Sequence, residues 1–335
     1  MSRRLRLSRL AAATTVILAV TAACGSGGTS ASGGASTSAA GTHGTLIVFG
    51  AGTLATPFTA EIAAFKKKYP GVTVRSQFGA SGDMVKNITQ LHQPADVLGV
   101  ADYSLIPKLM FPGHATWYLG FVSNQITFAY TSHSKGAGQL TPANWYKILA
   151  QPGVHIGRSN PAADPSGYQI LQMLQLANGY YHDPKLSASV LKNSPDSSVA
   201  ETETSQLAAL QSGQIDYLAI YKSSALESHL KYIVLPAQIN LSDPAMAADY
   251  AKVSIHAGSL GTLAAKPIIY GLTIPASAPN AALGEKFVSF VLSPAGQAIM
   301  RGNGFVVISP ALANPQDKVP ASIKPLTTPW PSSGG

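Results

Sequence analysis

The sequence contains a single cysteine, few charged residues and no clustered basic stripe. One cysteine cannot form an intramolecular disulfide, so no disulfide framework holds this chain together. Charged residues make up 11% of the chain, and the lysine run at 66–68 is typical of the solvated end of one helix, which argues against a nucleic-acid-binding surface. After residue 24, no stretch is long and apolar enough to cross a membrane.

The first residues form an export signal. A basic segment with four arginines precedes an apolar core at residues 10–22 that is too short to span a membrane, and small residues then lead to Cys24. We therefore expect a signal peptide at residues 1–23. The cysteine after small residues resembles the lipobox of bacterial lipoproteins, which implies lipid attachment at Cys24 and an extracytoplasmic protein anchored to the cell membrane surface. A plain secretory signal that ends near a cysteine is the alternative.

The rest of the chain divides by composition and length. Residues 24–43 are rich in Gly, Ser, Thr and Ala without apolar periodicity, which predicts a flexible tether. Removal of the signal leaves 19 of the 23 basic residues against 15 acidic ones, so the net charge falls from +8 to +4. The remaining length suits two lobes. We expect residues 44–126 and 272–315 in lobe I, residues 127–271 in lobe II, and a tail at 316–335.

Short β-branched runs alternate with helical patterns, which is typical of an α/β fold with largely parallel sheets. The first two predicted strands, at 45–49 and 72–78, each lead through a glycine-bearing turn into a helix. Thr53 and Ser81 lie in these turns. Further strands are expected at 95–102, from Ile156, at 214–221 and at 266–275, and a helix at 283–292. The long apolar run at 120–130 would pass from one lobe to the other, and the strand at 266–275 would return the chain to the first lobe.

Two similar turns lie in the predicted lobe II, at Ser166 and at Glu203. A helix start has unpaired backbone N–H groups and a partial positive charge, so it binds an anion without any cationic side chain. One such turn alone would be an ordinary capped helix start. Four of them, two in each lobe, predict an anion-binding cleft between the lobes. The hydroxyls of Thr53, Ser81 and Tyr221 would add neutral donors, which suit an oxyanion that carries no proton.

Several motifs together carry a family resemblance. They are Gly50-Ala51-Gly52-Thr53-Leu54, Ala95-Asp96-Val97-Leu98 with Ala101-Asp102-Tyr103, Asn144 to Leu149, Ile156 to Pro161, Asp164-Pro165-Ser166-Gly167-Tyr168, and Ile215-Asp216-Tyr217 with Tyr221-Lys222-Ser223. With them the chain resembles the substrate-binding component of molybdate/tungstate ABC importers, especially the archaeal-type tungstate/molybdate-binding proteins, over nearly all of residues 45–313.

The resemblance implies a two-lobed periplasmic-binding-protein fold of type II with two strand crossovers and a ligand cleft between the lobes. It implies a monomeric binding protein rather than an enzyme, with no cofactor, that closes on molybdate or tungstate and presents it to a membrane permease. The oxyanion-binding roles it assigns fall on the hydroxyls of Thr53 and Ser81, the backbone amides of Ser166 and Glu203, and the phenol of Tyr221.

The resemblance leaves the coordination geometry open. Archaeal-type members complete an octahedral shell around the metal with two carboxylates; Asp164 matches one, but Ile220 stands at the position that the resemblance implies for the other. A lone carboxylate that faces a dianion in a dry site is repelled. The sequence therefore favours tetrahedral binding with Asp164 as a helix cap turned away from the ligand. Asp164 as an additional ligand is the alternative.

Two other functional classes fit parts of the sequence. Ser132 and Lys135 match the S-x-x-K pattern of penicillin-interacting serine enzymes, but the companion K-T-G motif is absent and the pattern falls in a glycine-bearing linker. The histidines have no metal-ligand spacing. A binding protein for another oxyanion, such as sulfate or phosphate, or a lipoprotein of adhesive role, remains the second alternative.

Overall fold

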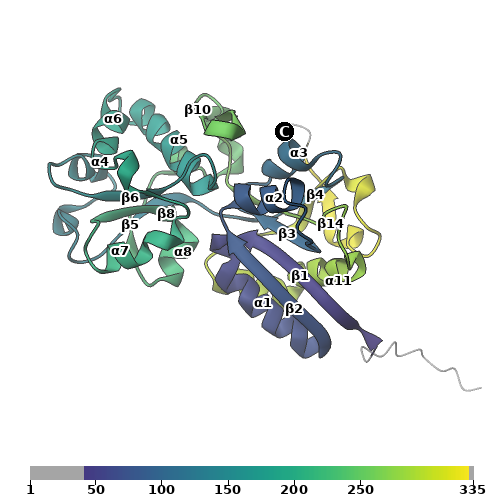
Figure 1. Cartoon of the computed structure of the whole chain (residues 1–335). Helices are drawn as coiled ribbons and strands as arrows, with labels where there is room; N and C mark the ends of the chain where they lie inside the picture. Colours follow the sequence, from purple (N-terminus) through teal and green to yellow (C-terminus); the bar gives the residue numbers. More distant parts are fainter. Residues whose placement is uncertain (1–40, 332–335) are drawn as a thin grey trace, which may run out of the picture. The chain divides into compact units, whose positions relative to one another are not determined.

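The computed structural model describes residues 41–331, which form two lobes, each built on one mixed β-sheet with helices around it (Figure 1). The predicted signal, Cys24 and most of the predicted tether lie outside these residues. No helix between residues 41 and 331 has the length and apolarity needed to cross a membrane.

The sheet of lobe I has seven strands in the order β14-β13-β4-β12-β3-β1-β2. The strands are β1 (His43–Ala51), β2 (Gly71–Gly79), β3 (Val97–Val100), β4 (Tyr118–Ser123), β12 (Ile269–Thr273), β13 (Val306–Asn314) and β14 (Thr327–Pro329). Strand β1 pairs in parallel with β2 and β3, whereas β12 is antiparallel to β3 and β4. The sheet is therefore mixed rather than largely parallel, because β4 and β12 carry the chain out of lobe I and back.

The sheet of lobe II has five strands in the order β7-β6-β8-β5-β9. They are β5 (Ile126–Tyr130), β6 (Ile156–Ser159), β7 (Val199–Ala200), β8 (Tyr217–Tyr221) and β9 (Lys231–Tyr232). Strand β8 is parallel to β6 and antiparallel to β5. Strands β10 (Ser254–His256) and β11 (Thr262–Ala264) form a separate hairpin before the chain returns to lobe I.

The chain crosses between the lobes twice. The apolar run at 120–130 passes from one lobe to the other, as expected, and forms two strands in two sheets, β4 and β5, separated by Asn124 and Gln125. The return strand β12 begins at Ile269, so residues 269–271 belong to the sheet of lobe I although we expected them in lobe II. The reason is that their backbone pairs with β3 and β4.

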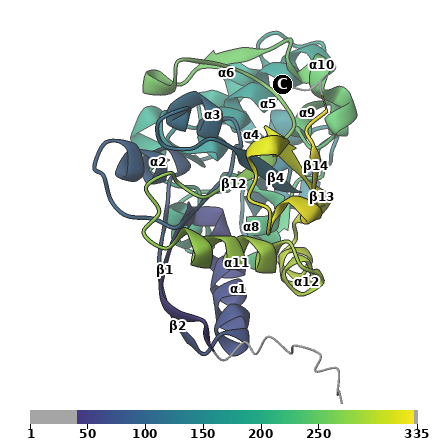
Figure 2. The same ribbon diagram turned by 90° about the vertical axis from the view of Figure 1, so that its right-hand side faces the viewer.

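Helices pack around each sheet. Lobe I carries α1 (Ala55–Lys68), α2 (Ser81–Thr89), α3 (Leu105–Met110), α11 (Ala281–Val291) and α12 (Pro294–Gly302). Figure 2 shows α11 and α12 beside α1. Phe58 and Phe65 of α1 meet Phe287 of α11 with ring centroids 5.9 and 5.3 Å apart, which places an aromatic core between these helices.

Lobe II carries the long helix α5 (Pro165–Tyr180), which packs against β5, β6 and β8. The shorter helices are α4 (Trp145–Leu149), α6 (Leu186–Leu191), α7 (Leu207–Gln211), α8 (Lys222–Glu227), α9 (Ala237–Asn240) and α10 (Ala247–Tyr250). Because β6 leads through a short turn into α5, the start of this helix lies at the end of the strand.

The C-terminal segment joins lobe I, where we predicted a tail. Strand β14 pairs in parallel with β13. Trp330 then packs against Tyr103 and Tyr118, with ring centroids 4.4 and 5.5 Å apart. A side chain at Gly120 would lie only 2.7 Å from the Trp330 ring, so this glycine makes room for the indole. Aromatic packing therefore orders residues that local sequence pattern did not predict.

Candidate functional site

The predicted binding residues lie at the ends of strands and at the starts of helices. Thr53 is in the short 3-10 helix η2 (Gly52–Leu54) before α1, and Ser81 is the first residue of α2. Ser166 is the second residue of α5, Glu203 precedes the 3-10 helix η5 (Thr204–Gln206), and Tyr221 ends β8. All five residues, and Asp164, are at most 6% exposed.

Asp164 occupies the centre of the lobe II turns. Its Oδ1 accepts a hydrogen bond from the Ser166 amide at 3.1 Å, which makes Asp164 the N-cap of α5, as predicted. Its Oδ2 accepts from the Glu203 amide at 3.3 Å. The two amides expected to hold an oxyanion thus both donate to this carboxylate. Burial raises the pKa of Asp164 to about 6, although these two hydrogen bonds act in the opposite direction.

Glu203 contributes a second buried carboxylate, whereas the sequence assigned a role only to its amide. Its side chain is fully buried; Oε2 accepts from the Tyr221 amide at 3.0 Å and Oε1 from the Ser224 hydroxyl at 2.7 Å. Burial raises the pKa of Glu203 well above its usual value, and the nearby charge of Asp164 adds to this effect. Two carboxylates therefore lie in this cluster.

Ile220 does not face the cluster. It packs in an apolar group with Leu210 and Leu218 of lobe II. The sequence argument for tetrahedral binding assumed that Asp164 was the lone carboxylate because Ile220 filled the other position. That assumption is wrong, since Glu203 brings its carboxylate from a different part of the chain. The spacing of residues within β8 gave no signal of this contact.

Tyr270 of β12 connects the two lobes at this point, and the sequence did not identify it. Its hydroxyl lies 3.0 Å from the Thr53 hydroxyl, and its ring centroid lies 5.8 Å from that of Tyr221. Asn124, in the first crossover, donates to Tyr270 at 3.4 Å and to Ser223 at 2.6 Å. The sequence did offer one signal for Tyr270. It places a tyrosine, with its polar hydroxyl, in the otherwise apolar return strand, and that strand had to pass beside the site.

The Tyr221 phenol has a protein partner as well. It donates to Oε1 of Gln169, one turn into α5, at 2.5 Å. The hydroxyl of Ser159, at the end of β6, similarly lies 2.5 Å from the Ser166 hydroxyl. The predicted donors are therefore held in place by hydrogen bonds to neighbouring elements, and Gln169 is a further polar residue that the sequence analysis missed.

The turn at Ser81 contacts the turn at Asp164 directly. The Ser81 hydroxyl accepts from the Ala101 amide at 3.1 Å, and the next amide, that of Gly82, donates to the Ala163 carbonyl at 2.9 Å. A Cβ atom at Gly82 would lie 2.9 Å from the same carbonyl oxygen, so this approach requires glycine. The structure thus brings residues from all four predicted turns into one buried polar cluster, which we call the oxyanion cluster after the role predicted for it: Thr53, Ser81, Asp164, Ser166, Glu203 and Tyr221.

The basic residues nearest in sequence are engaged elsewhere. Arg158 pairs with Asp196 at 2.6 Å, and the Lys222 ammonium lies 5.6 Å from the Tyr232 ring centroid. Within residues 41–331, no group of three or more His, Cys, Asp or Glu residues is arranged to hold a metal ion. The cluster therefore contains hydroxyls and backbone amides, which can donate hydrogen bonds, and two carboxylates, which when ionised can only accept them.

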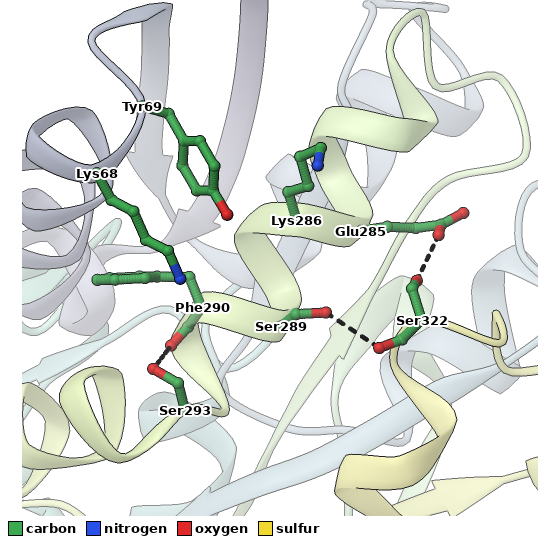
Figure 3. A pocket seen from close by; sticks show the side chains of 8 residues that line it. All are labelled: Lys68, Tyr69, Glu285, Lys286, Ser289, Phe290, Ser293 and Ser322. Atoms are coloured by element: carbon green, nitrogen blue, oxygen red, sulfur yellow. Dashed lines mark hydrogen bonds between the residues drawn. The ribbon is translucent and has the colours of Figure 1, made fainter. Parts of the chain in front are cut away.

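A pocket of about 240 Å³ lies elsewhere on lobe I (Figure 3). It is lined by residues of α1, α11, the start of α12 and the C-terminal segment: Lys68, Tyr69, Glu285, Lys286, Ser289, Phe290, Ser293 and Ser322. It shares no residue with the oxyanion cluster, so it is a separate feature of lobe I.

The serine-enzyme pattern is not assembled into a site. Ser132 is exposed, and the Lys135 ammonium donates to the Gly153 carbonyl. The Tyr217 phenol donates a hydrogen bond to the Lys135 carbonyl at 2.6 Å. A lysine that serves as a base must reach the serine hydroxyl, and here its hydrogen bond leads away to a neighbouring loop.

Known proteins share both the sequence and the fold. Residues 46–306 match the family described as bacterial extracellular solute-binding protein. The chain is 39% identical over 308 residues to the molybdate/tungstate-binding protein WtpA of Pyrococcus abyssi, with 84% of this chain and 89% of the relative covered. It is 38% identical over 286 residues to an uncharacterized solute-binding protein of Petrotoga mobilis, with the same coverage.

Among solved structures, the sulfate-binding protein SubI of Mycobacterium tuberculosis aligns with a TM-score of 0.58 at 16% identity, covering 78% of this chain and 86% of SubI. The periplasmic molybdate-binding protein of Azotobacter vinelandii aligns with a TM-score of 0.57 at 19% identity, covering 78% and 99%. These likenesses confirm the predicted periplasmic-binding-protein fold. The family match confirms that the chain is a binding protein rather than an enzyme: it belongs to the family of bacterial extracellular solute-binding proteins.

Proposed function

We propose that this protein captures molybdate or tungstate outside the cytoplasm and delivers it to the permease of an ABC importer. The observation that carries the proposal is the oxyanion cluster, in which buried hydroxyls and amides of both lobes lie close together. Among residues 41–331, no cationic side chain forms a hydrogen bond with its members. The relatives named as molybdate/tungstate-binding proteins support the same ligand.

The ligand would replace partners that the donors have now. Thr53 and Ser81 would donate hydroxyls from lobe I, and Ser166, Glu203 and Tyr221 would donate two amides and a phenol from lobe II. The Ser166 and Glu203 amides now donate to Asp164, so capture requires the carboxylate to give up these bonds to the oxyanion. Neutral donors replace the hydration shell of the anion in a site that excludes water.

The two carboxylates suggest how the site selects its ligand. Buried carboxylates repel an anion that only accepts hydrogen bonds. Molybdenum(VI) and tungsten(VI) accept additional oxygen ligands, whereas the central atoms of sulfate and phosphate stay tetrahedral. We propose that Asp164 and Glu203 bond to the metal and complete an octahedral shell, which would favour molybdate and tungstate over the other two anions.

The proposal extends to the segment that precedes the lobes. Cys24 would carry the lipid that anchors a monomeric protein to the outer face of the membrane, and residues 24–43 would form the tether. The two lobes, which follow this tether, would then form the part that meets the permease.

Calorimetry tests the proposed function directly. The chain without its signal, carrying Cys24→Ser, is titrated with molybdate, tungstate, sulfate and phosphate. We expect saturable heat with the first two and none with the last two at the same concentrations. Heat with sulfate or phosphate alone would show a binding protein for another oxyanion, and no heat with any of the four would refute oxyanion capture.

A further inference from the structure

Two residues of the sequence motifs have no role in the oxyanion cluster, and the structure brings them together. Tyr168, in the first turn of α5, donates its phenol to Oδ2 of Asp102 at 2.7 Å. Asp102 follows β3 in lobe I, whereas Tyr168 belongs to lobe II. Their side chains are almost fully buried, so this hydrogen bond joins the lobes in an environment shielded from water.

Asp102 is held as a charged acceptor. The Lys266 ammonium, on the segment that returns to β12, lies 2.9 Å from Oδ1, and the amide and hydroxyl of Ser104 each donate to the same oxygen at 2.9 Å. Burial acts to raise the pKa of Asp102, but the charge of Lys266 and the hydrogen bonds outweigh it and the pKa is lowered. Hydrogen bonds to an ionised carboxylate are stronger than those between neutral groups.

The bond lies beside the proposed ligand groups of both lobes. Ala101, next to Asp102, donates its amide to the Ser81 hydroxyl, and Tyr168 is two residues beyond Ser166. On the other side, the Gly82 amide donates to the Ala163 carbonyl across the same interface. Ser81 and Ser166 are therefore flanked by hydrogen bonds that form only when the lobes are together.

We propose that Tyr168 and Asp102 form a latch that holds the lobes closed and sets the rate at which bound oxyanion is released. Only the release step of this inference rests on the proposed function. The latch stabilises the closed state and contributes nothing to the open one, so its loss shifts the balance toward opening. Both are positioning residues, which act through the start of α5 and the end of β3.

The test compares Tyr168→Phe with Tyr217→Phe in stopped-flow release of molybdate or tungstate. Tyr217 is a matched control, because its buried phenol donates to the Lys135 carbonyl within lobe II. Loss of a hydrogen bond to a charged group predicts release about tenfold to a hundredfold faster for Tyr168→Phe. The association rate should change little, and the control should release at the wild-type rate. Equal release rates for Tyr168→Phe and wild type would overturn the latch.

A second readout needs no ligand. In a Cys24→Ser chain, spin labels at Lys67→Cys in lobe I and Ser212→Cys in lobe II, both exposed positions, report the distance between the lobes. We expect Tyr168→Phe, but not Tyr217→Phe, to shift the distribution to longer distances. An unchanged distribution would refute the latch. If the wild type binds no oxyanion, the proposed function fails, and these distances alone decide whether the latch exists.

Discussion

At the scale of single residues, the buried carboxylates of Asp164 and Glu203 carry the proposal for how the site works. Motif and spacing predicted the cap at Asp164 and the amide roles of Ser166 and Glu203, because helix starts have recognisable sequences. The carboxylate of Glu203 was not predicted, because its approach to Asp164 depends on how the segment after β7 folds back onto β8. Contacts between residues distant in sequence leave no local pattern.

The carboxylates can be tested by isosteric replacement. We expect Asp164→Asn and Glu203→Gln each to weaken molybdate binding at least tenfold, because an amide oxygen is a poorer ligand for the metal than a carboxylate. The exposed Asp196→Asn, also in lobe II, is the control. Calorimetry measures the three affinities, and equal or tighter binding by both cluster variants would instead favour tetrahedral binding through hydrogen bonds alone.

The hydroxyl donors form a separate prediction. Ser81→Ala and Tyr221→Phe should each weaken oxyanion binding by about 1 to 3 kcal/mol, the cost of losing a buried hydrogen bond to a charged partner. Unfolding measurements on the ligand-free variants separate this loss from any change in stability, since the Ser81 hydroxyl also accepts from the Ala101 amide. Wild-type affinity in both variants would place the site elsewhere.

Glu61 on α1 makes stability depend on pH. Its side chain is fully buried, its carboxylate oxygens have no hydrogen-bond partner among residues 41–331, and burial raises its pKa to about 8. The folded state therefore keeps a proton that the unfolded chain loses near pH 4.5, so stability falls as pH rises between these values. We expect wild type to lose about 3 kcal/mol of unfolding free energy relative to Glu61→Gln between pH 5 and 8. Urea unfolding at both values measures this, and parallel curves for the two proteins would contradict it.

At the scale of elements, the strands and helices with strong local patterns were predicted to within a few residues, as for β1, β2 and α11. The errors arose where tertiary contacts decide. The passage of the apolar run at 120–130 between the lobes was expected, but the position of the break at Asn124 was not, because apolar periodicity does not mark it. The C-terminal segment becomes β14 through packing of one indole ring.

Trp330 gives a test of this element. We expect Trp330→Ala to destabilise the protein by about 3 kcal/mol, near the lower end for a packed aromatic side chain, because contacts with Tyr103 and Tyr118 are lost and β14 detaches. Val306→Ala, at an exposed position of β13, is the control. Thermal or urea unfolding measures both, and equal stability would show that β14 adds nothing to lobe I.

At the scale of the whole molecule, two sheets from an interleaved chain place strand ends and helix starts of both lobes at one buried cluster. The resemblance of a few motifs predicted the two-lobed fold, and the likeness to solved structures confirms that fold. In the proposed function, lobe I would supply hydroxyls and lobe II would supply amides, a phenol and the carboxylates, so complete coordination of the ligand would require both lobes together.

X-ray absorption at the molybdenum edge tests the central claim most directly. The protein is incubated with molybdate, freed of unbound ligand by gel filtration, and its spectrum is compared with that of free molybdate. We predict retained molybdenum with a shell expanded from tetrahedral to octahedral oxygen coordination, and a return toward tetrahedral in Asp164→Asn. Retained molybdenum with an unchanged tetrahedral shell, or no molybdenum retained at all, would contradict the account.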